Sequence, residues 1–84
     1  MNKQLKIELP QEIESGIYAN GISVTHADNE FFLDFIRIIP YADNSALGKV
    51  VSRIIINPQN AKRVMDALRD NIKKYENDFG EIKV

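Results

Sequence analysis

The feature that most constrains the fold is one continuous apolar stripe near the carboxyl end of the sequence. Its members recur at spacings of four and three residues, the period of one helix face: Ala61, Met65, Leu68, Ile72, Tyr75 and Phe79. Asn57 and Pro58 are typical of a helix start, and Gly80 is typical of a helix end. We therefore predict a helix over residues 58–79. At about 1.5 Å per residue this helix measures about 33 Å, whereas a six-residue strand measures about 20 Å, so the helix should extend beyond its own sheet.

Upstream of this helix, apolar and polar residues alternate in the way that is typical of strands. The pattern predicts strands over residues 4–9, 18–27, 30–39 and 49–56, with one helical turn around Ile13. Pro10 ends the first of these segments, and a polar loop bounded by Pro40 and Gly48 separates the last two. The sequence thus predicts a single α+β domain over residues 1–84, a four-stranded, largely antiparallel sheet followed by one long helix.

The hairpin between the second and third strands sets which side chains share a face. With Asp28 and Asn29 as its turn, Ala27 pairs with Glu30, and cross-strand partners lie on the same side of the sheet. One side, the apolar face, then carries Tyr18, Ile22, Val24, Phe31, Leu33, Phe35 and Ile39. The other, the mixed face, carries Ser23, Thr25, Phe32, Asp34, Ile36 and Ile38.

The register of the last strand depends on Arg53. Placing Val50, Ser52, Ile54 and Ile56 on the apolar face keeps this arginine out of the core and beside Asp34, whereas the other register would bury its charge. Val51 and Ile55 then join the mixed face. The Asp34–Arg53 pair has two interpretations, a structural ion pair that fixes strand register or the centre of a binding surface. Arg37, on the opposite face of the same strand as Asp34, is a third candidate member.

Composition argues against several classes of function. Eleven Lys and Arg residues stand against twelve Asp and Glu residues, so the charge gives no general attraction to nucleic acid or to an anionic membrane. Without cysteine, disulfides and thiolate metal sites are excluded. The amino-terminal segment alternates where a signal peptide would be continuously apolar, and no run approaches the roughly 20 apolar residues of a membrane span, so we expect a cytoplasmic protein.

Catalytic and metal-binding constellations are weak. His26 is the single histidine, and although Thr25 and Asp28 lie close to it in sequence, neighbouring residues of a strand point to opposite faces. Asp66 and Asp70 lie among basic residues at helical spacing, which indicates exposed ion pairs rather than a metal site. We therefore expect a protein that is not an enzyme and that needs no cofactor or metal.

The remaining notable feature is the apolar character of the mixed face, because a patch of this kind usually marks an interface. Its candidate interaction residues are Phe32, Asp34, Ile36, Arg53 and Ile55. So short a chain has a small core, which favours self-association. We expect a homodimeric binding or protein-interaction module with a further protein partner. The alternative is a single-stranded nucleic-acid binder using Phe32, Arg37, Tyr41, Lys49 and Arg53.

Four segments carry a resemblance to a known family. They are YAN at 18–20, DFIRIIP at 34–40, VVSRIIINPQNAKR at 50–63 and ALRDNIKKYENDFGEI at 67–82. With them the chain resembles a widespread family of short bacterial and archaeal proteins known as a domain of unknown function, and the resemblance implies no activity. In the order of its predicted elements the chain also looks like the repeat of PUR-type and whirly-type nucleic-acid binders, in which two units exchange helices; this is an analogy of fold, which does not imply function.

Overall fold

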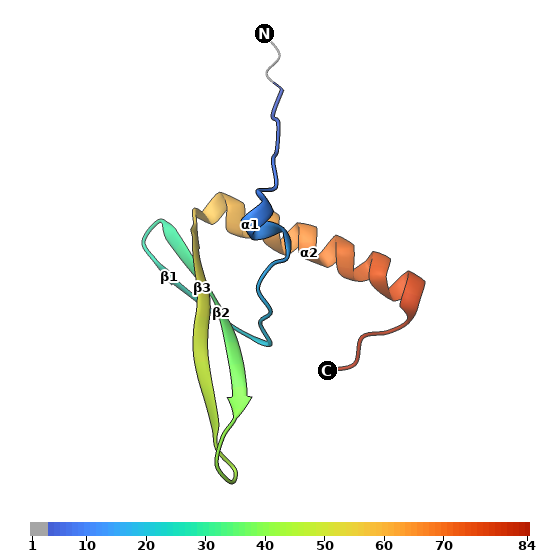
Figure 1. The fold of residues 1–84 in the computed structure, drawn as a ribbon. Coiled ribbons are helices and arrows are strands. Elements are labelled where there is room, and N and C mark those ends of the chain that lie inside the picture. The colour runs from blue at the N-terminus through green and yellow to red at the C-terminus, as the bar shows by residue number, and fades with distance from the viewer. Residues whose placement is uncertain (1–3) are drawn as a thin grey trace.

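The computed structural model describes residues 4–84 and shows a small sheet with a long helix at one end (Figure 1). Its elements, in chain order, are α1 (Gln11–Glu14), β1 (Gly21–Ala27), β2 (Glu30–Pro40), β3 (Ala46–Ile56) and α2 (Pro58–Phe79). The α+β class and the single helical turn around Ile13 are therefore confirmed.

The sheet has three antiparallel strands in the order β1-β2-β3. Ala27 pairs with Glu30, and Ile22, Val24 and His26 pair with Phe35, Leu33 and Phe31, the register predicted from the hairpin turn. Asn29 adopts a φ of 65°, a left-handed conformation that asparagine tolerates better than most residues. The turn chemistry of Asp28 and Asn29 thus fixed this register correctly.

The predicted first strand, residues 4–9, is absent, so the prediction of a four-stranded sheet was wrong. This segment extends away from the sheet (Figure 1), and Leu5 and Ile7 are 86% and 83% exposed. An alternating pattern makes a segment compatible with a strand, but a strand forms only where backbone groups of a neighbour are available for pairing. With three strands the sheet also differs from the four-stranded unit of PUR-type and whirly-type proteins.

A β-bulge in β3 changes which of its side chains reach each face. Ser52 pairs with Phe35, but the next pair is Val50 with Ile36, which leaves Val51 as the extra residue. Because Ile36 belongs to the mixed face, the prediction that Val50 lies on the apolar face was wrong. Val51, assigned to the mixed face, instead lines a cavity with Phe35 and Ser52. Ser52, Ile54 and Ile56 keep the predicted side.

The predicted bounds of α2 are confirmed. Oδ1 of Asn57 accepts a hydrogen bond from the backbone N–H of Asn60 at 2.9 Å, and Pro58 occupies the first helical position. Gly80 ends the helix with a φ of 97°. The carboxyl-terminal tail forms no strand among the described residues; the N–H of Ile82 donates to the carboxylate of Glu76 at 2.9 Å.

The contacts between the sheet and α2 are few and involve β2, and from the end of β3 the helix runs away from the sheet (Figure 1). Consequently no hydrophobic side chain within residues 4–84 is buried. Neither helix in this part of the chain is long and apolar enough to cross a membrane. The fold thus presents apolar surface on both sides of the sheet and along the helix.

Candidate interaction surfaces

The mixed face is organised around a bidentate ion pair between β2 and β3. Asp34 and Arg53 are directly paired across the two strands, as predicted. Nε of Arg53 donates to Oδ1 of Asp34 at 2.6 Å, and Nη2 donates to Oδ2 at 2.8 Å. Asp34 is 7% exposed and is the one buried polar residue of the described chain, whereas the side chain of Arg53 is 56% exposed. The carboxylate is thus enclosed by the sheet, and the guanidinium forms its lid.

This geometry favours the ionised form of both groups. The hydrogen bonds from Arg53 lower the pKa of Asp34, against the opposing effect of burial and with the help of the positive charge. The same hydrogen bonds, followed by the negative charge of Asp34, raise the pKa of Arg53. The pair is therefore a fixed, mutually neutralising unit, with little charge left to attract an ionic ligand.

Apolar side chains surround the ion pair. The guanidinium carbon of Arg53 lies 5.3 Å from the ring centroid of Phe32, which is half-buried beside it. Ile36 is half-buried as well, and Ile55 is 52% exposed. All five predicted members of the candidate interaction face therefore come together on one side of the sheet.

Two glycines shape the same face farther along the strands. A β-carbon on Gly21 would lie 2.8 Å from Cδ1 of Ile38, and one on Gly48 would lie 3.3 Å from Cγ2 of Ile36. Glycine on both outer strands thus leaves room for these two isoleucines to lie over their neighbours. The apolar part of the mixed face extends in this way from Phe32 to Ile38.

The alternative nucleic-acid set does not form one surface. Phe32 and Arg53 lie on the mixed face, whereas strand alternation places Arg37 and its cross-strand partner Lys49 on the opposite side. The guanidinium carbon of Arg37 lies 5.1 Å from the ring centroid of Tyr18. Tyr41 follows β2 in the turn to β3 and is 62% exposed. Three strand cations and two aromatic residues are thus divided between two faces and a turn.

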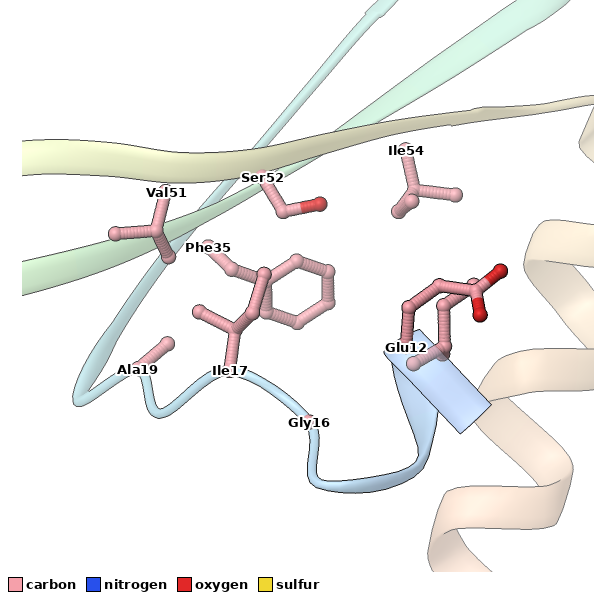
Figure 2. A pocket seen from close by; sticks show the side chains of 9 residues that line it. Glu12, Gly16, Ile17, Ala19, Phe35, Val51, Ser52 and Ile54 are labelled. Carbon is pink, nitrogen blue, oxygen red and sulfur yellow. The ribbon is translucent and has the colours of Figure 1, made fainter. Parts of the chain in front are cut away.

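The apolar face borders two cavities. The larger, about 770 Å³, separates the sheet from α2 between Ala61 and Asn71. Its sheet side is formed by Ile22, Val24, Phe31, Leu33, Phe35 and Ile56. The smaller, about 360 Å³, lies between the sheet and the segment from Glu12 to Ala19; Figure 2 shows Ile17 and Ala19 of this segment facing Val51 and Ser52 of β3. The helix and the connecting segment approach the sheet without closing on it.

The residues considered as catalytic or metal-binding candidates contact neighbouring side chains of the sheet or of α2. The ring of His26 lies 5.6 Å from that of Phe31, its cross-strand partner. Asp66 accepts a long hydrogen bond from Arg69 at 3.4 Å on the exposed side of α2. No group of three or more His, Cys, Asp or Glu residues within residues 4–84 is placed to hold a metal ion.

Asn20 is a positioning residue that the sequence patterns did not reveal. Its side chain accepts a hydrogen bond from the N–H of Ile38 at 2.7 Å and donates one to the carbonyl oxygen of Ile38 at 3.1 Å. Its own N–H donates to the carbonyl oxygen of Ile36. The amide side chain thus continues the pairing of β2 where β1 has not yet begun, which explains why β1 starts at Gly21 rather than at the predicted residue 18. The YAN segment was the available signal, but it carried no periodicity.

These features define a small α+β domain with two incompletely covered apolar surfaces and one ion pair whose carboxylate is buried. The whole chain, residues 1–84, matches the model of a family described as Protein of unknown function (DUF3467), and the protein belongs to that family, as its sequence segments predicted. No curated protein and no solved structure matches the chain.

Proposed function

We propose that this protein is a non-enzymatic protein-interaction module that works as a homodimer in the cytoplasm. The observation that carries the proposal is the exposed area of the single chain, 8103 Å². A compact monomer of 9.6 kDa exposes about 5,100 Å². The excess of about 3,000 Å² exceeds the roughly 1,000–2,500 Å² that a subunit buries in many obligate homodimers.

The character of the excess surface supports the same proposal. Ile22 and Val24 are each 57% exposed, and Leu68 is 59% exposed, although their spacing is that of core positions. Exposed apolar area of this extent drives association, because its burial contributes about 25 cal/mol per Å². A second copy of the same chain can bury this apolar surface, and it is always present at the same concentration as the first.

The mixed face supports the interaction part of the proposal. Its ion pair is satisfied within the chain, so the surface that remains consists of half-exposed apolar side chains with one arginine lid. Protein interfaces are enriched in aromatic residues and arginine at the centre of such patches. We propose that this face binds a different protein once the dimer has formed.

Light scattering of the purified protein at micromolar concentration tests the dimer. We expect a mass near twice 9.6 kDa. A mass of one chain would overturn the proposal.

A pull-down after nuclease treatment tests the mixed face. We expect the wild-type protein to retain a protein partner that the Ile55→Asp variant loses while remaining dimeric. Lys73→Asp, on the exposed side of α2, is the matched control and should retain the partner. Loss of the partner on nuclease treatment alone would instead indicate a nucleic-acid ligand.

A further inference from the structure

The distal half of α2 has no sheet to cover. The cavity against the apolar face ends at Asn71, whereas the apolar stripe continues to Ile72, Tyr75 and Phe79. These three side chains are 39%, 52% and 75% exposed. The ring centroids of Tyr75 and Phe79 lie 5.0 Å apart, so the two rings form one apolar projection near the end of the helix.

The apolar face of the sheet, in turn, is larger than the area that α2 of the same chain covers. The cavity of about 770 Å³ holds no side chain of the described residues between α2 and the sheet. Its open side lies at β1, where Ile22 and Val24 are each 57% exposed, whereas Phe31, Leu33 and Phe35 on β2 are half-buried. An additional apolar element placed over β1 would close it.

We propose that two copies exchange these features, so that the distal half of α2 from each copy fills the cavity on the apolar face of the other. The inference rests on the proposed homodimer and names the segments that form it. In a two-fold dimer the same contact occurs twice, since the helix end of each subunit meets the sheet of its partner. One contact then covers both the distal part of the α2 stripe and the apolar face. This agrees with the exposed area of each chain, which exceeds that of a compact monomer by about 3,000 Å².

The charges of α2 are compatible with this arrangement. The chain carries a net charge of −1, so two copies repel each other weakly. Lys62, Asp66 and Lys73 lie off the apolar stripe and remain in solvent when the stripe is covered. Covering the stripe therefore leaves these three charges in solvent.

Cross-linking tests the exchange, and the absence of native cysteine makes the chain well suited to it. A tagged Phe79→Cys chain is co-expressed with an untagged Val24→Cys chain and treated with a short flexible bis-maleimide. We expect a covalent tagged–untagged species on a denaturing gel. Thr25→Cys is the matched control, because it neighbours Val24 but lies on the mixed face, and it should give no such species with Phe79→Cys.

A single chain carrying both Val24→Cys and Phe79→Cys gives the converse result. We expect covalent dimers; a cross-link confined to one chain would show that α2 folds onto its own sheet and would overturn the exchange. Efficient cross-linking through Thr25→Cys would overturn it as well. If the cross-link fails while light scattering still gives a dimer, the exchange is wrong and the proposed homodimer stands, whereas a monomeric wild-type protein contradicts the proposed function itself.

A second measurement avoids cysteine. Ile72→Asp should raise the dimer dissociation constant at least a hundredfold, because a carboxylate would enter the cavity of the partner. Lys73→Asp, one residue away on the solvent side, should leave the dimer intact. A dimer of wild-type affinity in Ile72→Asp would overturn the exchange. If an apolar fluorescent dye binds the wild-type dimer as strongly as it binds Ile72→Asp, the cavity stays open in the dimer, which would overturn the exchange too.

Discussion

At the scale of single residues, Asp34 and Arg53 are the clearest case of a sequence signal with two interpretations. A charge interrupting an apolar strand indicates either a register-fixing pair or a binding centre. The bidentate geometry and the enclosure of Asp34 favour the structural role, because both carboxylate oxygens are already occupied. The guanidinium plane of Arg53 stays exposed beside Phe32, and its charge is neutralised by Asp34.

The ion pair predicts how stability depends on pH. Because the pKa of Asp34 is lower in the folded chain than in the unfolded chain, its contribution is complete above the unfolded pKa of about 4 and is lost as the pH falls through the folded value. We expect the wild-type midpoint of urea unfolding to fall more steeply on acidification below about pH 5 than that of Asp34→Asn. Arg53→Gln should show the same flattened profile, since it removes the partner. An acid profile of Asp34→Asn identical to that of the wild type would contradict the pairing.

At the scale of elements, α2 is a helix whose ends are set by local signals and whose apolar stripe lacks a packing surface. The cap at Asn57, the proline at Pro58 and the left-handed Gly80 define its limits without reference to the sheet. Its stripe, by contrast, remains exposed along its length in the single chain. Local signals thus determine where the helix lies in the sequence, whereas its stability depends on burial of the stripe.

The helix cap gives a prediction at this scale. Asn57→Ala removes the hydrogen bond to the N–H of Asn60 and should destabilise the fold by about 1 kcal/mol. Asn57→Asp keeps an acceptor at the positive end of the helix and should stay close to the wild type. Urea unfolding at one fixed protein concentration measures both, because the stability of an associating protein depends on concentration. Equal stability of all three proteins would show that the cap contributes nothing.

At the scale of the whole molecule, the single chain is too extended for its length. Its radius of gyration is 16.6 Å, whereas a compact chain of 84 residues has about 12 Å and a compact protein of twice that length about 15 Å. The radius of gyration of the single chain therefore exceeds that of a compact protein of twice its length. The same openness explains why both sides of the sheet are available as surfaces.

The charge distribution predicts the outcome for nucleic acid. Arg53 is neutralised by Asp34, and Arg37 and Lys49 lie on the other side of the sheet, so no face gathers all three strand cations. We expect no binding of a labelled single-stranded oligonucleotide by fluorescence anisotropy at micromolar protein and physiological salt. Phe32→Ala should therefore leave the signal unchanged. A micromolar dissociation constant that weakens with salt at a log–log slope near about −2, the value for three phosphate contacts, would put the nucleic-acid alternative first.

The sequence by itself determined the elements whose signals are local. The hairpin at Asp28 and Asn29, its register, the pairing of Asp34 with Arg53 and both ends of α2 followed from turn chemistry, alternation and capping. Each of these depends on residues that are close in sequence or on the cost of burying one charge, so a pattern suffices to predict it.

Only the tertiary structure decided the features that depend on distant neighbours. Residues 4–9 have the alternation of a strand but no strand beside them, and the bulge at Val51 exchanges the faces of Val50 and Val51 without any mark in the periodicity. Asn20 acquires its role from the backbone of Ile38, eighteen residues away. The exposed stripe of α2 likewise shows that amphipathic spacing specifies a surface to be covered, whereas what covers it depends on how separate parts of the fold meet.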